Sequence, residues 1–139
     1  MTFKPPMRDL PAGRLRDLVH AVLERLPTAD RAAVLGAVRE VVPGDLSMAR
    51  QSGQCDSWDP GDDQVRIVVD AIWLALADDG RLQDVLRHEF AHAVYGHPQR
   101  LGVIGALDPA GRADWQRHFE TEAVALAVEW GRNGSFRRP

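Results

Sequence analysis

Two histidines four residues apart, with a glutamate directly after the first, lie in the segment VLRHEFAHAVYGH at residues 85–97. If this segment is helical, His88 and His92 lie about 40° apart around the helix and one turn apart along it. Two imidazoles placed in this way can bind one zinc ion. Glu89 lies about 100° round from His88, where its carboxylate can accept a proton from a water on that ion. The pattern predicts zinc-dependent attack of water on a carbonyl carbon, which is the chemistry of peptide-bond hydrolysis.

A catalytic zinc site needs three protein ligands and an open position for water. The longer motif with a glycine and a third histidine on the same helix is excluded, because Tyr95 and Pro98 occupy those two places. His97 is the nearest substitute, and Gly96 is expected to end the helix before it. We therefore keep His97 as a reserve ligand, with a polar residue at a helix end as the alternative.

The last expected helix supplies a carboxylate. Its buried face is predicted to carry four apolar residues, Trp115, Phe119, Leu126 and Trp130. With Trp115 as the zero of angle, Glu122 falls inside that face at about −20°, whereas Glu120 falls on the solvent side at about 140°. A carboxylate on an apolar face needs a cation, so Glu122 is the predicted third ligand. An ion pair between Glu122 and a buried arginine is the alternative.

Two more residues of that helix lie near the same face. Glu129, at about −40°, is a second reserve ligand. His118 lies one turn before Glu122, so it is a candidate for stabilising the oxyanion of the reaction or for orienting Glu122. A partly exposed structural histidine is the alternative for His118.

The elements that position these residues follow from the spacing of apolar and turn residues. Apolar residues recur at helical spacing over residues 15–26 and 34–41, which predicts two N-terminal helices. Pro27 is expected to end the first helix, and Pro43 and Gly44 to end the second. Residues 45–70 bring turn residues and β-branched residues instead. They predict two or three short strands, of which Val65 to Val69 is the clearest.

The second half of the chain is expected to be mainly helical. A short helix over residues 71–77 and a break at residues 78–80 precede a motif helix over residues 81–95, which Gly96 caps. Pro98 is expected to confirm that stop, and a glycine-rich loop to follow. The last helix is predicted from near Pro109 to Trp130, closed by Gly131.

The composition favours one globular domain of 139 residues, with residues 1–10 and 131–139 as loose tails. A net charge of −3 and a pI near 5.9 argue against nucleic acid or anionic lipid as a partner. Cys55 is the single cysteine, which excludes an internal disulfide and fits a reducing compartment. Neither a secretory signal nor a membrane span is recognisable, so we expect a cytoplasmic protein.

With HEFAH at residues 88–92 and ETEAVALAVEW from Glu120 onwards, the sequence resembles the gluzincin metallopeptidases. Within that group it looks most like ImmA/IrrE-type proteins and stand-alone minimal gluzincins, over roughly residues 65–130. The resemblance implies a single-domain α+β zincin-like fold with N-terminal helices, a small, mostly antiparallel sheet, the motif helix and a C-terminal glutamate helix. It implies Zn²⁺ held by His88, His92 and Glu122, with Glu89 as the general base. It also implies that residues 67–70 form an edge strand, which pairs with an extended peptide.

The sequence thus predicts a zinc metallopeptidase that acts on a peptide or protein substrate, without fixing its cleavage preference or oligomeric state. One alternative is a latent zinc-binding regulatory or interaction protein on the same scaffold. Another is a metal-free interaction domain whose histidines are surface residues, and it predicts that a chelator changes nothing.

Overall fold

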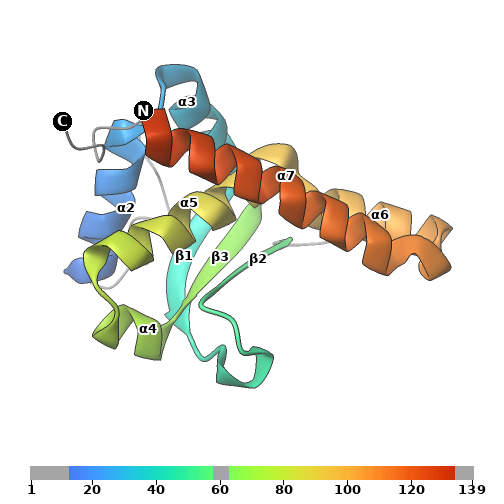
Figure 1. The fold of residues 1–139 in the computed structure, drawn as a ribbon, viewed down its shortest axis with the longest axis horizontal. Coiled ribbons are helices and arrows are strands. Elements are labelled where there is room, and N and C mark those ends of the chain that lie inside the picture. The colour runs from blue at the N-terminus through green and yellow to red at the C-terminus, as the bar shows by residue number, and fades with distance from the viewer. Residues whose placement is uncertain (1–12, 58–62, 134–139) are drawn as a thin grey trace.

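A computed structural model describes residues 13–57 and 63–133 of the chain (Figure 1). Its helices are α2 (Arg14–Arg25), α3 (Thr28–Ala37), α4 (Ala71–Leu76), α5 (Asp79–Tyr95), α6 (His97–Leu107) and α7 (Arg112–Asn133), with 3-10 turns η1 (Ser47–Ala49) and η2 (Pro109–Gly111). Its strands are β1 (Val38–Gly44), β2 (Gly53–Ser57) and β3 (Val65–Asp70). Of the two expected tails, residues 1–10 and residues 134–139 of the tail at 131–139 lie outside the described residues.

The three strands form one mixed sheet in the order β1-β3-β2. Strand β3 pairs in parallel with β1 and antiparallel with β2, so the α+β prediction is confirmed, whereas a mostly antiparallel sheet is not observed. The predicted edge strand at residues 67–70 is wrong, because those residues belong to the central strand. Val65, Ile67 and Val69 of β3 are buried, as expected for a strand with a partner on each side. The edge that borders the motif helix is β2 instead.

The second N-terminal helix ends earlier than predicted. Residues 38–41 were expected to continue it, but they begin strand β1, in which Val41 lies opposite Ile67 of β3. Val34, Val38 and Val41 are all buried. Their spacing fits a helix face, yet β-branched residues also suit a strand, and pairing with β3 decides between the two.

The motif helix α5 has both of its ends defined by caps. The Asp78 carboxylate accepts a hydrogen bond from the Arg81 backbone N–H at 2.8 Å, so the helix begins at Asp79 and the predicted break at residues 78–80 shrinks to the N-cap. Gly96 ends the helix with φ 65°, as predicted. Helix α5 contacts α7 and also the strands β2 and β3 (Figure 1).

The segment after Gly96 is a helix rather than the predicted glycine-rich loop. Pro98 lies in the first turn of α6, where a proline lacks no hydrogen bond that the helix needs, so it begins a helix here instead of confirming a stop. Helix α7 continues past Gly131 to Asn133, contrary to the prediction. Trp130 is buried and its indole N–H donates to Asp30 of α3 at 2.9 Å, which holds this end of α7 in place.

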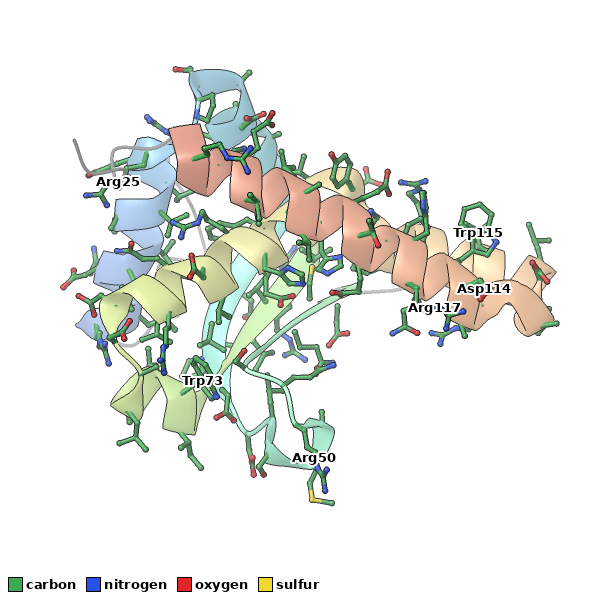
Figure 2. The ribbon with its side chains drawn as sticks, in the orientation of Figure 1. Arg25, Arg50, Trp73, Asp114, Trp115 and Arg117 are labelled. Carbon is green, nitrogen blue, oxygen red and sulfur yellow. The ribbon has the colours of Figure 1, made fainter. Side chains whose placement is uncertain are left out.

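The other end of α7 is exposed. Trp115 lies there beside the ion pair of Asp114 with Arg117, far from the sheet (Figure 2). Trp115 is 38% exposed, whereas Phe119, one turn later, is 2% exposed. None of the helices within residues 13–57 and 63–133 has the length and apolar character that crossing a membrane requires.

Candidate metal centre

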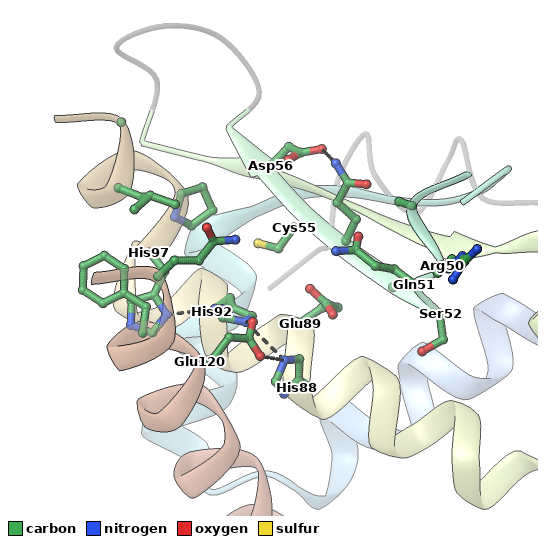
Figure 3. Close-up of a pocket in the computed structure, with 18 of the residues that line it drawn as sticks. Arg50, Gln51, Ser52, Cys55, Asp56, His88, Glu89, His92, His97 and Glu120 are labelled. Atoms are coloured by element: carbon green, nitrogen blue, oxygen red, sulfur yellow. Dashed lines mark hydrogen bonds and ion pairs between the residues drawn. The ribbon is translucent and has the colours of Figure 1, made fainter. Parts of the chain in front are cut away.

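Three side chains, two from α5 and one from α7, converge between these helices. The Nε2 atoms of His88 and His92 lie 3.2 Å apart. The carboxylate of Glu120, on α7, lies 2.7 Å from His92 Nε2 through Oε1 and 3.1 Å from His88 Nε2 through Oε2. These three residues form a group that can hold a metal ion (Figure 3). The pairing of His88 and His92 on one helix face agrees with their spacing in the sequence.

The third residue of the donor group differs from the predicted third ligand. Glu120 occupies the place expected for Glu122, and Glu122 Oε1 lies 3.0 Å from Nε2 of His97 instead. The expected exposures were right in order, because the Glu122 side chain is 32% exposed and that of Glu120 is 53% exposed. The imidazoles of α5 lie beside the more exposed edge of α7, so the more exposed glutamate, Glu120, is the one that joins the donor group. Burial on a helix face was therefore the wrong criterion for the ligand.

The separation of the two imidazole donors suits a small tetrahedral cation. Two donors that are each about 2.1 Å from a tetrahedral zinc ion are about 3.4 Å apart. The imidazole nitrogens are 3.2 Å apart and the Glu120 oxygens lie 2.7 and 3.1 Å from them. Two imidazoles and one carboxylate are also a donor set that zinc binds.

The three donors stabilise one another electrostatically. Hydrogen bonds from His88 and then His92 hold the pKa of Glu120 far below its usual range. The same bond to Glu120 raises the pKa of His88, against the opposing effect of burial. Glu120 is therefore ionised at neutral pH, as a metal ligand must be.

Glu89 lies in the wall of the cleft, on the side of α5 that meets β2. Its side chain is 7% exposed, and burial is the main cause that raises its pKa from 4.5 to about 7, while His88 and His92 lower it. Strand β2 approaches closely because it has a glycine here. A Cβ on Gly53 would lie 3.0 Å from Cγ and 3.1 Å from Oε2 of Glu89.

The donor group opens into a cleft of about 850 Å³. Strand β2, the loop before it, and helices α5, α6 and α7 line this cleft, with Glu89 and Cys55 pointing in from opposite sides (Figure 3). Burial raises the pKa of the Cys55 thiol well above its usual value, and Glu89 adds to this rise. Arg112, Gln116 and Glu120 recur every four residues along α7 and all line the cleft. This polar stripe is the sequence signal that could have pointed to Glu120.

His97 and Glu122 form a pair next to the donor group. Nδ1 of His97 lies 2.8 Å from Nδ1 of His92, so His97 contacts a predicted ligand without joining the group itself. The side chain of His97 is buried, which lowers its pKa. The buried arginine that was considered as a partner for Glu122 is replaced by this histidine, and the half-exposed Arg100 approaches Glu122 only to 4.0 Å.

The other two predicted residues lie outside the donor group. The His118 side chain is 57% exposed and its Nε2 lies 3.9 Å from Oε1 of Glu122, so His118 lies next to Glu122, and this contact also fits the alternative of a partly exposed structural histidine. Glu129 is exposed near the far end of α7, beside Trp130. Within the described residues, the group that can hold a metal contains neither of them.

Comparison of the chain with protein-family models, with curated proteins and with solved structures found no match.

Proposed function

We propose that the protein is a zinc-dependent peptidase in which His88, His92 and Glu120 hold the metal and Glu89 is the general base. The observation that carries the proposal is the convergence of three donors within 4.8 Å of one another at the edge of an open cleft. The motif that supplies two of them also places a glutamate beside them. A strand, the motif helix and a later glutamate helix follow in the order that the resemblance to gluzincins implies, and we extend the proposal to a zincin-like fold.

The chain's own residues supply proton transfer. A zinc ion, when bound, lowers the pKa of a coordinated water to about 7 and polarises a carbonyl oxygen. Glu89 accepts a proton from the attacking water and later donates it to the leaving amine. Since its side chain lies against Gly53 and has little exposure, its carboxylate is held in one place rather than free to turn into solvent.

Strand β2 supplies the surface for an extended substrate. It pairs with β3 along one edge, and its residues 53–56 line the cleft in front of the donor group. The main chain of an edge strand can pair with a peptide through backbone hydrogen bonds, which hold the peptide whatever its side chains are. A peptide bound there passes between β2 and α7, beside Glu89 and Glu120.

The test compares wild type with two variants in the presence of zinc, using an unfolded protein as substrate and mass spectrometry to detect new peptides. Glu89→Gln should retain one zinc ion per chain and lose hydrolysis by about 10²–10⁴-fold, because only the proton acceptor is removed. Glu120→Ala should lose zinc together with activity. Glu129→Gln removes an exposed carboxylate from the same helix as Glu120 and should behave as wild type.

Two results would refute the proposal. Hydrolysis by Glu89→Gln at the wild-type rate would remove Glu89 from the mechanism. Unchanged zinc content in Glu120→Ala would mean that the third ligand is another residue.

A control excludes a contaminating serine peptidase. A chelator should abolish the activity of wild type, and added zinc should restore it, whereas a serine peptidase would respond to neither.

A further inference from the structure

A chain of three side chains leads away from the proposed metal centre. His92 contacts the donor group through Nε2 and contacts His97 through Nδ1, at 2.8 Å from Nδ1 of that ring. The other nitrogen of His97, Nε2, lies 3.0 Å from Oε1 of Glu122. The motif helix, helix α6 and helix α7 each contribute one member. Each ring thus has both of its nitrogens engaged.

Only one arrangement of protons satisfies this chain when His92 binds a cation. Metal binding uses the lone pair of Nε2, so the single proton of neutral His92 is on Nδ1 and this nitrogen donates. Nδ1 of His97 must then accept, which places the proton of His97 on Nε2. That N–H donates to the Glu122 carboxylate, which only accepts when it is ionised. The direction of both hydrogen bonds is thereby fixed from the metal outwards.

The surroundings of His97 fix the orientation of its ring. The ring stacks on Phe119 with centroids 4.5 Å apart and planes at 14°, and it also stacks with Tyr95 at 5.1 Å and 23°. The His97 side chain is 4% exposed. It is also the first residue of α6, directly after Gly96, whose positive φ turns the chain there. A ring held on two sides in this way presents its two nitrogens to fixed points.

Glu122 is held as well. Besides His97, the guanidinium of Arg100 lies 4.0 Å and Nε2 of His118 lies 3.9 Å from the same carboxylate oxygen. Arg100 in turn lies over the ring of Phe119, at 4.7 Å from its centroid. The carboxylate therefore has cationic or hydrogen-bonding neighbours on α6 and on its own helix.

We infer that His97 and Glu122 are positioning residues for the metal ligand His92: they hold its ring in place and keep its Nε2 free for the ion. This inference rests on the proposed function, since it requires that His92 binds zinc. Partners of this kind orient the ligand and raise its basicity, and their loss lowers metal affinity by about 10–100-fold. Glu122 thus contributes to the site through two histidines rather than as a ligand.

The test measures the affinity for Zn²⁺ by competition with a chromophoric chelator. Glu122→Ala and His97→Phe should each bind zinc about 10–100-fold more weakly than wild type, while still binding one ion per chain. Glu122→Gln keeps an oxygen that can accept from His97, so it should fall between Glu122→Ala and wild type. Glu129→Ala, an exposed change on the same helix, should leave the affinity unchanged.

A second readout tests the proton arrangement directly. In zinc-loaded wild type, ¹⁵N NMR of the imidazole nitrogens should show a proton on Nδ1 of His92 and on Nε2 of His97. His97→Phe preserves the stacking on Phe119 and removes both hydrogen bonds, and the Glu122 side chain is 32% exposed. The urea midpoint of each variant shows separately whether folding is affected. A loss of affinity without a change in that midpoint supports the positioning role.

The outcomes separate this inference from the proposed function. If wild type binds zinc and hydrolyses peptides, but Glu122→Ala and His97→Phe keep wild-type affinity, the inference is overturned and the peptidase stands. A proton on Nδ1 of His97 in the zinc-loaded protein would overturn it too. If both variants weaken zinc binding but wild type hydrolyses nothing, the inference stands and the peptidase falls.

Discussion

Replacing Glu89 by glutamine should stabilise the metal-free protein, and the gain should depend on pH. Burial raises the pKa of Glu89 in the folded protein to about 7, from 4.5. The folded protein therefore binds this proton more tightly than the unfolded chain does. The stability that protonated Glu89 contributes is complete below pH 4.5 and is lost as the pH rises through about 7.

The size of the effect follows from the two pKa values. Each tenfold change in an equilibrium constant corresponds to about 1.4 kcal/mol, so ionised Glu89 costs the folded protein about 3 kcal/mol at pH 8 and about 1 kcal/mol at pH 5. Glutamine has nearly the same shape and no charge. Glu89→Gln should therefore raise the free energy of unfolding by about 3 kcal/mol at pH 8 and by only about 1 kcal/mol at pH 5.

Urea unfolding followed by circular dichroism, with a chelator present, measures both values. With a slope of about 1–3 kcal/mol per molar urea, the midpoint at pH 8 should rise by at least about 1 M. Glu129→Gln, an exposed change, should alter stability by no more than about 0.5 kcal/mol at either pH. Equal gains at pH 5 and pH 8, or no gain at pH 8, would refute the reasoning that Glu89 is buried at a cost. Added zinc should reduce the gain, because a nearby cation favours the ionised carboxylate.

Four further substitutions test the packing and the metal centre. Zinc at 100 times its dissociation constant should stabilise wild type by about 2.7 kcal/mol in thermal unfolding, and Glu120→Ala should lose this response at the same zinc concentration. Gly53→Ala should lower the free energy of unfolding by about 1–3 kcal/mol and slow hydrolysis, because its Cβ would lie 2.7 Å from a side chain of α5. Gly36→Ala, which meets nothing within 4 Å in helix α3, should instead stabilise by up to about 1 kcal/mol, as urea midpoints would show. Asp30→Ala should cost about 1–3 kcal/mol by leaving the buried indole N–H of Trp130 without its acceptor, again measured in urea.

The elements that could be predicted are those whose signals are local. Asp78 and Gly96 bracket the motif helix with a side-chain cap and a left-handed cap, and both act over a few residues of chain. Strand β3 shows its β-branched run directly in the sequence. His88 and His92 share a helix face by geometry alone, so their convergence needed no knowledge of the rest of the fold.

The predictions that were wrong concern elements whose structure depends on partners distant in sequence. Val38 and Val41 continue a helical spacing from Val34, and only the pairing of Val41 with Ile67 makes the segment a strand. Likewise, a proline such as Pro98 fits both after one helix and in the first turn of the next. The local sequence is compatible with both structures in each case, and tertiary packing determines which one forms.

The choice between Glu120 and Glu122 failed for a related reason. The angular positions ranked the exposure of the two side chains correctly, but they could not say which edge of α7 meets the imidazoles of α5. Glu122 did need a partner, as its place near the buried face suggested, and that partner is His97. Crossing angles between helices depend on side chains along the whole contact, so a single helix cannot reveal which of its edges meets a site.

The strand order has a consequence for how the chain assembles. Strand β3 inserts between two strands that both precede it, and β1 and β2 do not pair with each other. A nascent chain that ends before Val65 therefore holds two open segments with no shared ladder. The sheet can be completed only once β3 is present, so β2, which lines the cleft, has no strand partner until residues 65–70 have been synthesised.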